Sequence, residues 1–313
     1  MKRTIAKAAT VAAATWILAG SAAAAEPESC GEVRMAEPGW SDLAFTTGVA
    51  SVLLQALGYE TDTQVLGIPV IYQAMENGQL DLFLGYWDPA METYYAEFRD
   101  RGAVETVHQN LTGAKYTLAT LKPAWEAGLK DFADIQTYAD RLERKVYGIE
   151  PGSNQLMFDV LADPAFGLEG WEVVESSEQG MLSQVTREGE EGGWIVFQAW
   201  APHPMNLDHE IAYLTGGDAT YGPDFGGATV HTQVRQGYMA ECPNVARLLT
   251  NLTFTVEMES EGMGYILADG MAPEEAARTL LAEQPEVLEA WLAGVETRDG
   301  GDGLAAVRDD LGL

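Results

Sequence analysis

The chain has 313 residues, and its 48 acidic residues against 18 basic ones give a formal net charge of −30. Nucleic acid and anionic membrane surfaces are excluded as partners, because both would repel so acidic a chain. The charge suits a cationic ligand, but it equally suits a salt-rich habitat in which acidic surfaces keep proteins soluble. Charge alone therefore identifies no ligand.

The first 25 residues have the pattern of a secretory signal peptide. Basic residues at positions 2, 3 and 7 precede a mostly apolar stretch over 8–20, and the alanines at 22–25 offer cleavage sites. The apolar stretch is too short for a membrane span, although a retained N-terminal anchor is the alternative. We expect residues 1–25 to be removed and the mature protein to be soluble in the periplasm.

Strand-like and helix-like segments alternate along most of the mature chain. In chain order, the pattern predicts strands over 32–36, 59–65, 80–85, 115–120, 145–149, 171–175 and 194–199. It predicts helices over 41–57, 70–77, 131–142, 154–161, 178–187, 244–269 and 273–293, with Gly- and Thr-rich loops from 208 to 232 and a short terminal helix. Such alternation is typical of parallel sheets flanked by helices, which is an α/β fold.

Cys30 and Cys242 are the two cysteines of the chain, so they can form a single disulfide. Closing so long a loop stabilises the folded state by roughly 5 kcal/mol in the chain-entropy model. Two unpaired buried thiols are the alternative. With a length above the ~100–200 residues of one domain, the bridge predicts two lobes: lobe I from 26–110 plus 213–313, and lobe II from 111–212. Two chain crossings would form the hinge beside a cleft.

Three tryptophans stand just beyond predicted strands. Trp40, Trp87 and Trp200 follow the strands over 32–36, 80–85 and 194–199. Ligands of open parallel sheets bind beyond the carboxyl ends of strands, so all three lie where a site is expected. Indole faces attract cations, and a quaternary ammonium group, which has no N–H donors, suits aromatic walls. Core packing is the alternative for any one of them.

Six segments resemble the choline-binding proteins of ABC importers, within the glycine betaine/proline betaine substrate-binding family. They are EPGWSD at 37–42, AKYTLAT at 114–120, GIEPG at 148–152, ESSEQGM at 175–181, PHPM at 202–205 and GGATVHT at 226–232. The resemblance implies a two-lobed periplasmic binding protein fold (type II-like), with two parallel-rich sheets and a double-crossing hinge. It also implies a disulfide at the two cysteines.

The resemblance further implies an aromatic box of Trp40, Trp87, Trp200 and Tyr116 around the ammonium group. It implies that Asp42 accepts a hydrogen bond from the choline hydroxyl, although Asp42 would also serve as the N-cap of the following helix. The implied partner is the membrane permease of the importer. We expect a monomer with no cofactor and no metal.

Two positions depart from the resembled proteins. The segment after Gly152 is two residues shorter, so Asn154, with Ser153 beside it, is our candidate to bind the hydroxyl end of the ligand. Asp88 stands where an uncharged residue is expected, and it would tighten cation binding or select another head group. His203, between two prolines, is a further candidate, either as a contact or as a residue that shapes its loop.

Several alternatives remain open at this stage. The same cage could bind glycine betaine, trimethylamine N-oxide or another methylated amine, although few basic residues lie near it in sequence. A protein that presents its ligand to a sensor has the same sequence features. A periplasmic enzyme is the rival of another class, but the chain has none of the common hydrolase motifs.

Overall fold

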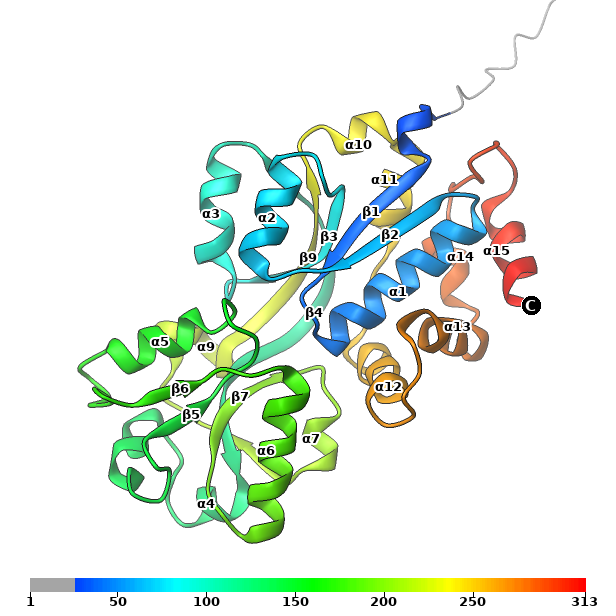
Figure 1. Cartoon of the computed structure of the whole chain (residues 1–313). Helices are drawn as coiled ribbons and strands as arrows, with labels where there is room; N and C mark the ends of the chain where they lie inside the picture. Colours follow the sequence, from blue (N-terminus) through cyan, green and yellow to red (C-terminus); the bar gives the residue numbers. More distant parts are fainter. Residues whose placement is uncertain (1–25) are drawn as a thin grey trace, which may run out of the picture.

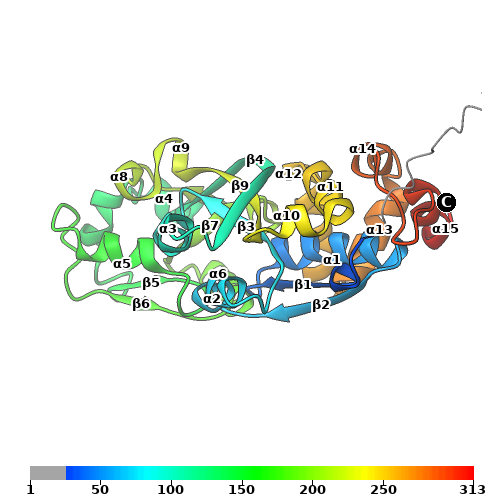
Figure 2. The ribbon, with the colours of Figure 1, turned by 90° about the horizontal axis from the view of Figure 1, so that it is seen from above.

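A computed structural model describes residues 26–313, and the predicted signal peptide lies outside them. These residues form two lobes of mixed α/β structure joined by two strands, β4 and β9 (Figure 1). Lobe I holds the first three strands and most of the C-terminal helices, and lobe II holds β5, β6 and β7. Seen from above, the lobes lie end to end (Figure 2). No helix within residues 26–313 is long and apolar enough to cross a bilayer.

The elements follow the predicted alternation in the first two thirds of the chain. The strands are β1 Glu32–Glu37, β2 Glu60–Val65, β3 Leu82–Asp88, β4 Val104–Leu121, β5 Lys145–Tyr147, β6 Glu172–Val174, β7 Val196–Ala201, β8 Ile211–Tyr213 and β9 Gly227–Arg235. The helices up to the second crossing are η1 Glu28–Cys30, α1 Ser41–Ala56, α2 Ile68–Glu76, α3 Glu92–Asp100, α4 Lys122–Glu126, η2 Phe132–Tyr138, α5 Gln155–Ala162, α6 Glu178–Glu191, α7 Met205–Asp208, α8 Asp218–Tyr221 and α9 Pro223–Gly226. The later helices are α10 Tyr238–Glu241, α11 Pro243–Asn251, α12 Val256–Leu267, α13 Pro273–Glu283, α14 Val287–Trp291 and α15 Gly303–Leu311.

The strands form one continuous sheet in the order β2-β1-β3-β9-β4-β7-β5-β6, with β8 also paired to β4. The outer pairs are parallel, as predicted, but β9 is antiparallel to β3 and β4, and β4 is antiparallel to β7. The expected two sheets are thus merged, because the 18-residue strand β4 runs through both lobes and pairs in each.

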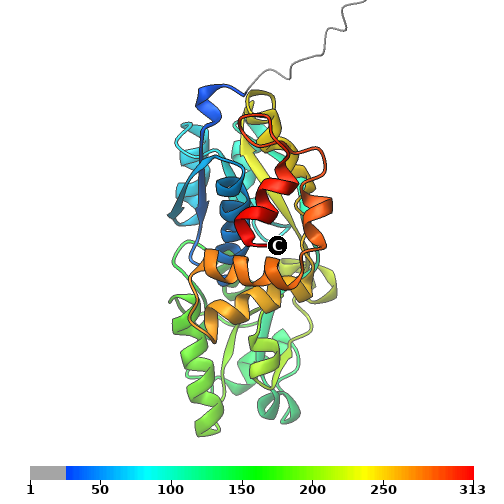
Figure 3. The same ribbon diagram turned by 90° about the vertical axis from the view of Figure 1, so that its right-hand side faces the viewer.

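Four predicted segments differ in the structure. The loop expected up to residue 232 contains strand β9, whose Ala228, Val230 and Thr232 are buried on one face. The helix predicted over 244–269 is split into α11 and α12, because Thr255 caps a new helix by accepting a hydrogen bond from the Met258 N–H. The segment 273–293 is split before α14, next to Pro285, and residues 132–138 form a 3-10 helix instead of an α-helix. Figure 3 shows these C-terminal helices packed at the side of lobe I.

Two hydrophobic cores lie on either side of the crossings. The larger one fills lobe I and extends into lobe II, and the smaller one lies within lobe II. Leu214 and Tyr221 pack in the smaller core, so the chain stays with lobe II until β9 begins. We accordingly propose the second boundary near residue 226 and not at 212, while the first, at residue 110, falls inside β4.

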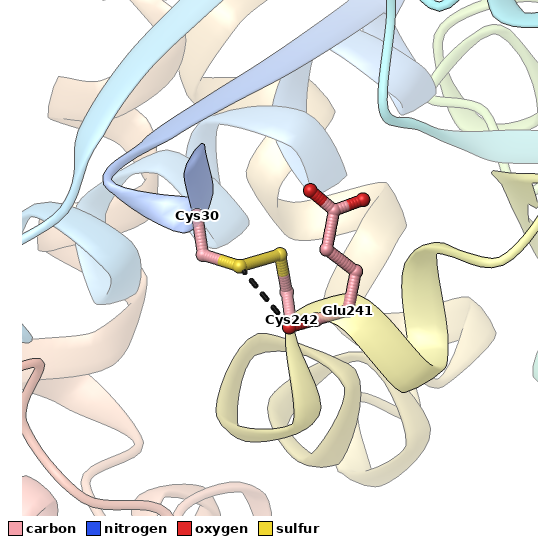
Figure 4. A group of neighbouring side chains, drawn as sticks. All are labelled: Cys30, Glu241 and Cys242. Atoms are coloured by element: carbon pink, nitrogen blue, oxygen red, sulfur yellow. Dashed lines mark hydrogen bonds between the residues drawn. A yellow bond between two sulfur atoms is a disulfide. The ribbon is translucent and has the colours of Figure 1, made fainter. Parts of the chain in front are cut away.

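The predicted disulfide joins Cys30 to Cys242, with their Cα atoms 5.6 Å apart (Figure 4). It fastens the start of β1 to the segment before α11, although 212 positions separate the two cysteines in sequence. Glu241 lies beside the bridge and accepts hydrogen bonds from Ser29 and Arg235. Both sulfurs are used by the bond, so this group offers no thiolate to a metal.

Candidate functional site

Trp40, Trp87, Tyr116 and Trp200 line one pocket between the lobes, together with Asp42. Trp40 directly precedes α1, Trp87 is near the end of β3, Tyr116 is in β4 and Trp200 is in β7. The four aromatic rings therefore come from four elements, and we call them the cage.

The pairing of β4 with β7 explains why Tyr116 belongs to the cage. Tyr116 and Trp200 are direct partners in this antiparallel ladder, so their side chains stand on the same face of the sheet. The rings of Tyr116 and Trp87 are 6.2 Å apart at an interplanar angle of 54°. Trp40, Trp87 and Trp200 are each buried.

Asp42 is 1% exposed and lines the pocket beside the cage. It is the second residue of α1 and not its N-cap, because that position belongs to Trp40. Its Oδ1 has no hydrogen-bond partner among residues 26–313. Burial, and next the charge of Glu178, raise the pKa of Asp42 from 3.8 to about 8. An unpartnered buried acceptor is costly, so a ligand donor or a positive charge would stabilise this carboxyl group.

Ser153 and Asn154 are neighbours in sequence but differ in their relation to the pocket. Ser153 lines the pocket, and its carbonyl accepts a hydrogen bond from the Tyr116 hydroxyl at 3.4 Å. Asn154, which the sequence placed in the site, is buried behind it, where its amide bonds to the backbone of Ile149 and Glu150 and to Glu175. Ser153 therefore contributes to the pocket wall, whereas the Asn154 amide supports the segment behind it.

Asp88 and His203 also lie outside the pocket. Asp88 accepts a hydrogen bond from the Tyr86 hydroxyl at 3.2 Å and borders a separate, open hollow beside Lys115. His203 packs edge-on against Trp200, with ring centroids 4.8 Å apart, and does not line the pocket. This position suits the second role predicted for His203, which is to shape the loop around Trp200.

The pocket has further walls that the sequence did not identify. Tyr94 is the most informative of them, because its hydroxyl accepts a hydrogen bond from the Gln155 N–H across the cleft at 3.3 Å. Its position in α3, soon after Trp87, was the only available signal. The other lining side chains are mostly apolar: Ile68, Ala90, Met91, Ile149, Gln155 and Leu156. Among the described residues, no Lys, Arg or His lines this pocket.

Comparisons with known proteins identify the family. Residues 31–283 match the family model described as the substrate binding domain of ABC-type glycine betaine transport systems. The chain belongs to this family of ABC-transporter substrate-binding proteins, as the sequence segments predicted, and the two-lobed fold is confirmed with it.

Solved structures and a curated relative agree with this placement. An ABC-transporter choline binding protein in complex with choline is 55% identical, with a TM-score of 0.90 over 91% of this chain and 100% of that one. An ABC-transporter choline binding protein in an unliganded semi-closed conformation is 54% identical over the same shares, with a TM-score of 0.84. The glycine betaine/carnitine transport binding protein GbuC of Listeria monocytogenes is 28% identical over 51% of this chain and 53% of its own length.

Proposed function

We propose that this protein captures choline in the cleft between its lobes and delivers it to the permease of an ABC importer. The observation that carries the proposal is the convergence of Trp40, Trp87, Tyr116 and Trp200, with Asp42, on one pocket. A trimethylammonium group has a diffuse charge and an apolar surface, and aromatic faces stabilise both. The Asp42 carboxyl group supplies an acceptor for the hydroxyl group at the other end of choline.

The expected free energy of choline binding is in the range of a transport binding protein. Four aromatic contacts at about 0.5–2 kcal/mol each and one hydrogen bond at about 1–3 kcal/mol give roughly 5–10 kcal/mol before the costs of association. This corresponds to a dissociation constant around the micromolar range, which permits both capture and release. The protein found similar at 55% identity was solved with choline bound.

Glycine betaine is the second candidate, favoured by the description of the family. Its carboxylate would need donors, and the described lining contains no cationic side chain. We therefore rank betaine below choline.

The remaining parts of the proposal follow from the family and the sequence. The cage and the pocket suit the capture of a small ligand, and the relatives are transport proteins. We therefore assign no catalysis to the site. The signal-like residues 1–25 and the disulfide suit the oxidising periplasm. We propose a monomer that acts with its permease.

Calorimetric titration with choline, acetylcholine, glycine betaine, carnitine and trimethylamine N-oxide tests the assignment. Choline should bind about tenfold or more tightly than betaine, since only choline offers a hydroxyl donor to Asp42. Tighter binding of betaine would overturn the choice of ligand while leaving the cage in place.

A further inference from the structure

Two carboxylates of lobe II reach across the cleft to the beginning of helix α1 in lobe I. Glu178 Oε2 accepts a hydrogen bond from the Ser41 backbone N–H at 2.8 Å, and its Oε1 accepts one from the Ser41 hydroxyl at 2.7 Å. Glu150 Oε2 accepts one from the Trp40 indole N–H, also at 2.8 Å. Each contact joins residues more than 100 positions apart in sequence.

Glu178 is fully buried, and its surroundings stabilise a negative charge. It is the first residue of α6, so it lies between the N-termini of α6 and α1, where the partial positive charges of two helices meet. His203 Nδ1 accepts the Met205 N–H at 2.9 Å, so in the neutral ring Nε2 carries the hydrogen and donates it to Glu178 at 3.0 Å. Both carboxylate oxygens of Glu178 are thus satisfied.

Glu150 is tied to the same arrangement. Its Oε1 accepts a hydrogen bond from the Glu178 backbone N–H at 3.0 Å, while its other oxygen holds Trp40. Because Trp40 is a wall of the cage, Glu150 fixes the orientation of one ring from the opposite lobe. Closing the cleft and completing the cage are therefore the same event.

The closed cleft also gathers like charges. Glu37 and Asp42 of lobe I lie near Glu150 and Glu178, and the pKa of Glu37, Asp42 and Glu150 is raised in each case, first by burial and further by neighbouring carboxylates. In an empty closed cleft these groups must either repel one another as carboxylates or take up protons, and both disfavour closure. A positive charge in the cage would offset it.

We propose that Glu150 and Glu178 are positioning residues that fasten the cleft through Trp40 and Ser41 and make its closure depend on the positive charge of the ligand. We call these four residues the latch. The inference rests on the proposed function, since it takes the ligand of the cage to be a cation. Specificity for a cation over a neutral molecule of the same shape would then come from closure as well as from the aromatic rings.

The test compares choline with 3,3-dimethyl-1-butanol, which has the same shape but no charge. In Glu178→Gln and Glu150→Gln the side chain keeps its shape and one acceptor but loses its charge. Each variant is expected to lose choline affinity by about tenfold or more while its affinity for the neutral alcohol changes by about twofold or less. Glu190→Gln, an exposed site on α6, is the matched control and should bind both as the wild type does.

Choline binding within about twofold of the wild type in both variants, or equal losses for the two ligands, would overturn the latch. A double-mutant cycle adds an independent criterion: Ser41→Ala should weaken choline binding in the wild type and have little further effect in Glu178→Gln. Additive losses would contradict a direct contact in the closed state. If Glu178→Gln does not fold, Glu150→Gln and Ser41→Ala decide the outcome on their own.

Small-angle scattering measures closure itself. The wild type should become more compact with choline but not with the neutral alcohol, whereas the Gln variants should show a smaller difference between the two ligands. Compaction of the wild type by both ligands would contradict the dependence on charge. A wild type that binds no choline would instead refute the proposed function.

Discussion

Asn154 and Ile149 exchange two hydrogen bonds, one from the Ile149 N–H to Asn154 Oδ1 and one from Asn154 Nδ2 to the Ile149 carbonyl, each at 2.9 Å. The amide is thereby used to shape the segment that carries Glu150 and Ser153. Asn154 acts on the site through this segment, and its side chain is not free to bind a hydroxyl group.

This relationship gives the first prediction. Asn154→Ala removes buried hydrogen bonds and should lower the free energy of unfolding by about 1–3 kcal/mol. Any loss of affinity should be equal for choline and for tetramethylammonium, which has no hydroxyl group. Calorimetric titration of both ligands is the measurement. A loss confined to choline would show that Asn154 contacts the hydroxyl end after all.

Trp200 supplies one wall of the cage and is the subject of the second prediction. Trp200→Ala should weaken choline binding by at least about 1–2 kcal/mol, because one cation–aromatic contact is lost. Trp125→Ala is the matched control, since Trp125 packs at the side of lobe II under Lys130, outside the pocket. Unchanged affinity in Trp200→Ala would remove this ring from the site.

Asp42 makes stability depend on pH. Its pKa is raised, first by burial, from 3.8 to about 8, so the folded, empty protein keeps a proton that the unfolded chain releases near pH 4. Asp42 therefore lowers the free energy of unfolding as the pH rises from about 4 to about 8. Asp42→Asn should be more stable than the wild type at pH 8, by on the order of a few kcal/mol, and similar near pH 4. Thermal unfolding across this range measures the difference, and a difference that does not vary with pH would contradict the assignment.

The same titration predicts proton release on binding. A cation in the cage stabilises the ionised carboxylate, so choline affinity should rise between pH 6 and 8, by up to about tenfold per pH unit. Calorimetry in two buffers with different ionisation enthalpies counts the released protons directly. Asp42→Asn should bind more weakly and show little dependence on pH. An identical pH dependence in this variant would assign the proton to another group.

The Cys30–Cys242 bridge should stabilise the fold without contributing to the site. It lies before the start of β1, whereas Trp40 of the cage follows the other end of that strand, and a loop closed over 212 positions is worth about 5 kcal/mol in the chain-entropy model. Reduction should lower the melting temperature, while choline affinity measured well below that temperature stays the same. A large loss of affinity in the folded, reduced protein would show that the bridge also sets the geometry of the cleft.

Three of the four cage residues could be predicted from the sequence, because in this fold the ends of the strands lie at the cleft. Trp40, Trp87 and Trp200 could be placed at the cleft from their positions after apolar strands, before any resemblance was used. Tyr116 could not, because a tyrosine inside a strand is usually a core residue; its place depends on the pairing with Trp200, a contact made 84 positions away.

The features that the sequence did not identify depend on contacts between segments that are distant in sequence. Glu178 stands in a matching segment, but nothing local shows that it bonds to Ser41 in the other lobe. The glycines and threonines of the segment up to residue 232 predict a loop, and only its pairing with β3 and β4 makes it strand β9, the second crossing. Such contacts are set by tertiary packing and not by local pattern.

The central claim is that four aromatic rings from both lobes surround one quaternary ammonium group. A crystal structure of the protein with choline tests it most directly. The account predicts the choline nitrogen within about 6 Å of the ring centroids of Trp40, Trp87, Tyr116 and Trp200, with the hydroxyl group bonded to Asp42. Choline bound elsewhere, or a nitrogen surrounded by carboxylates in place of these rings, would contradict it.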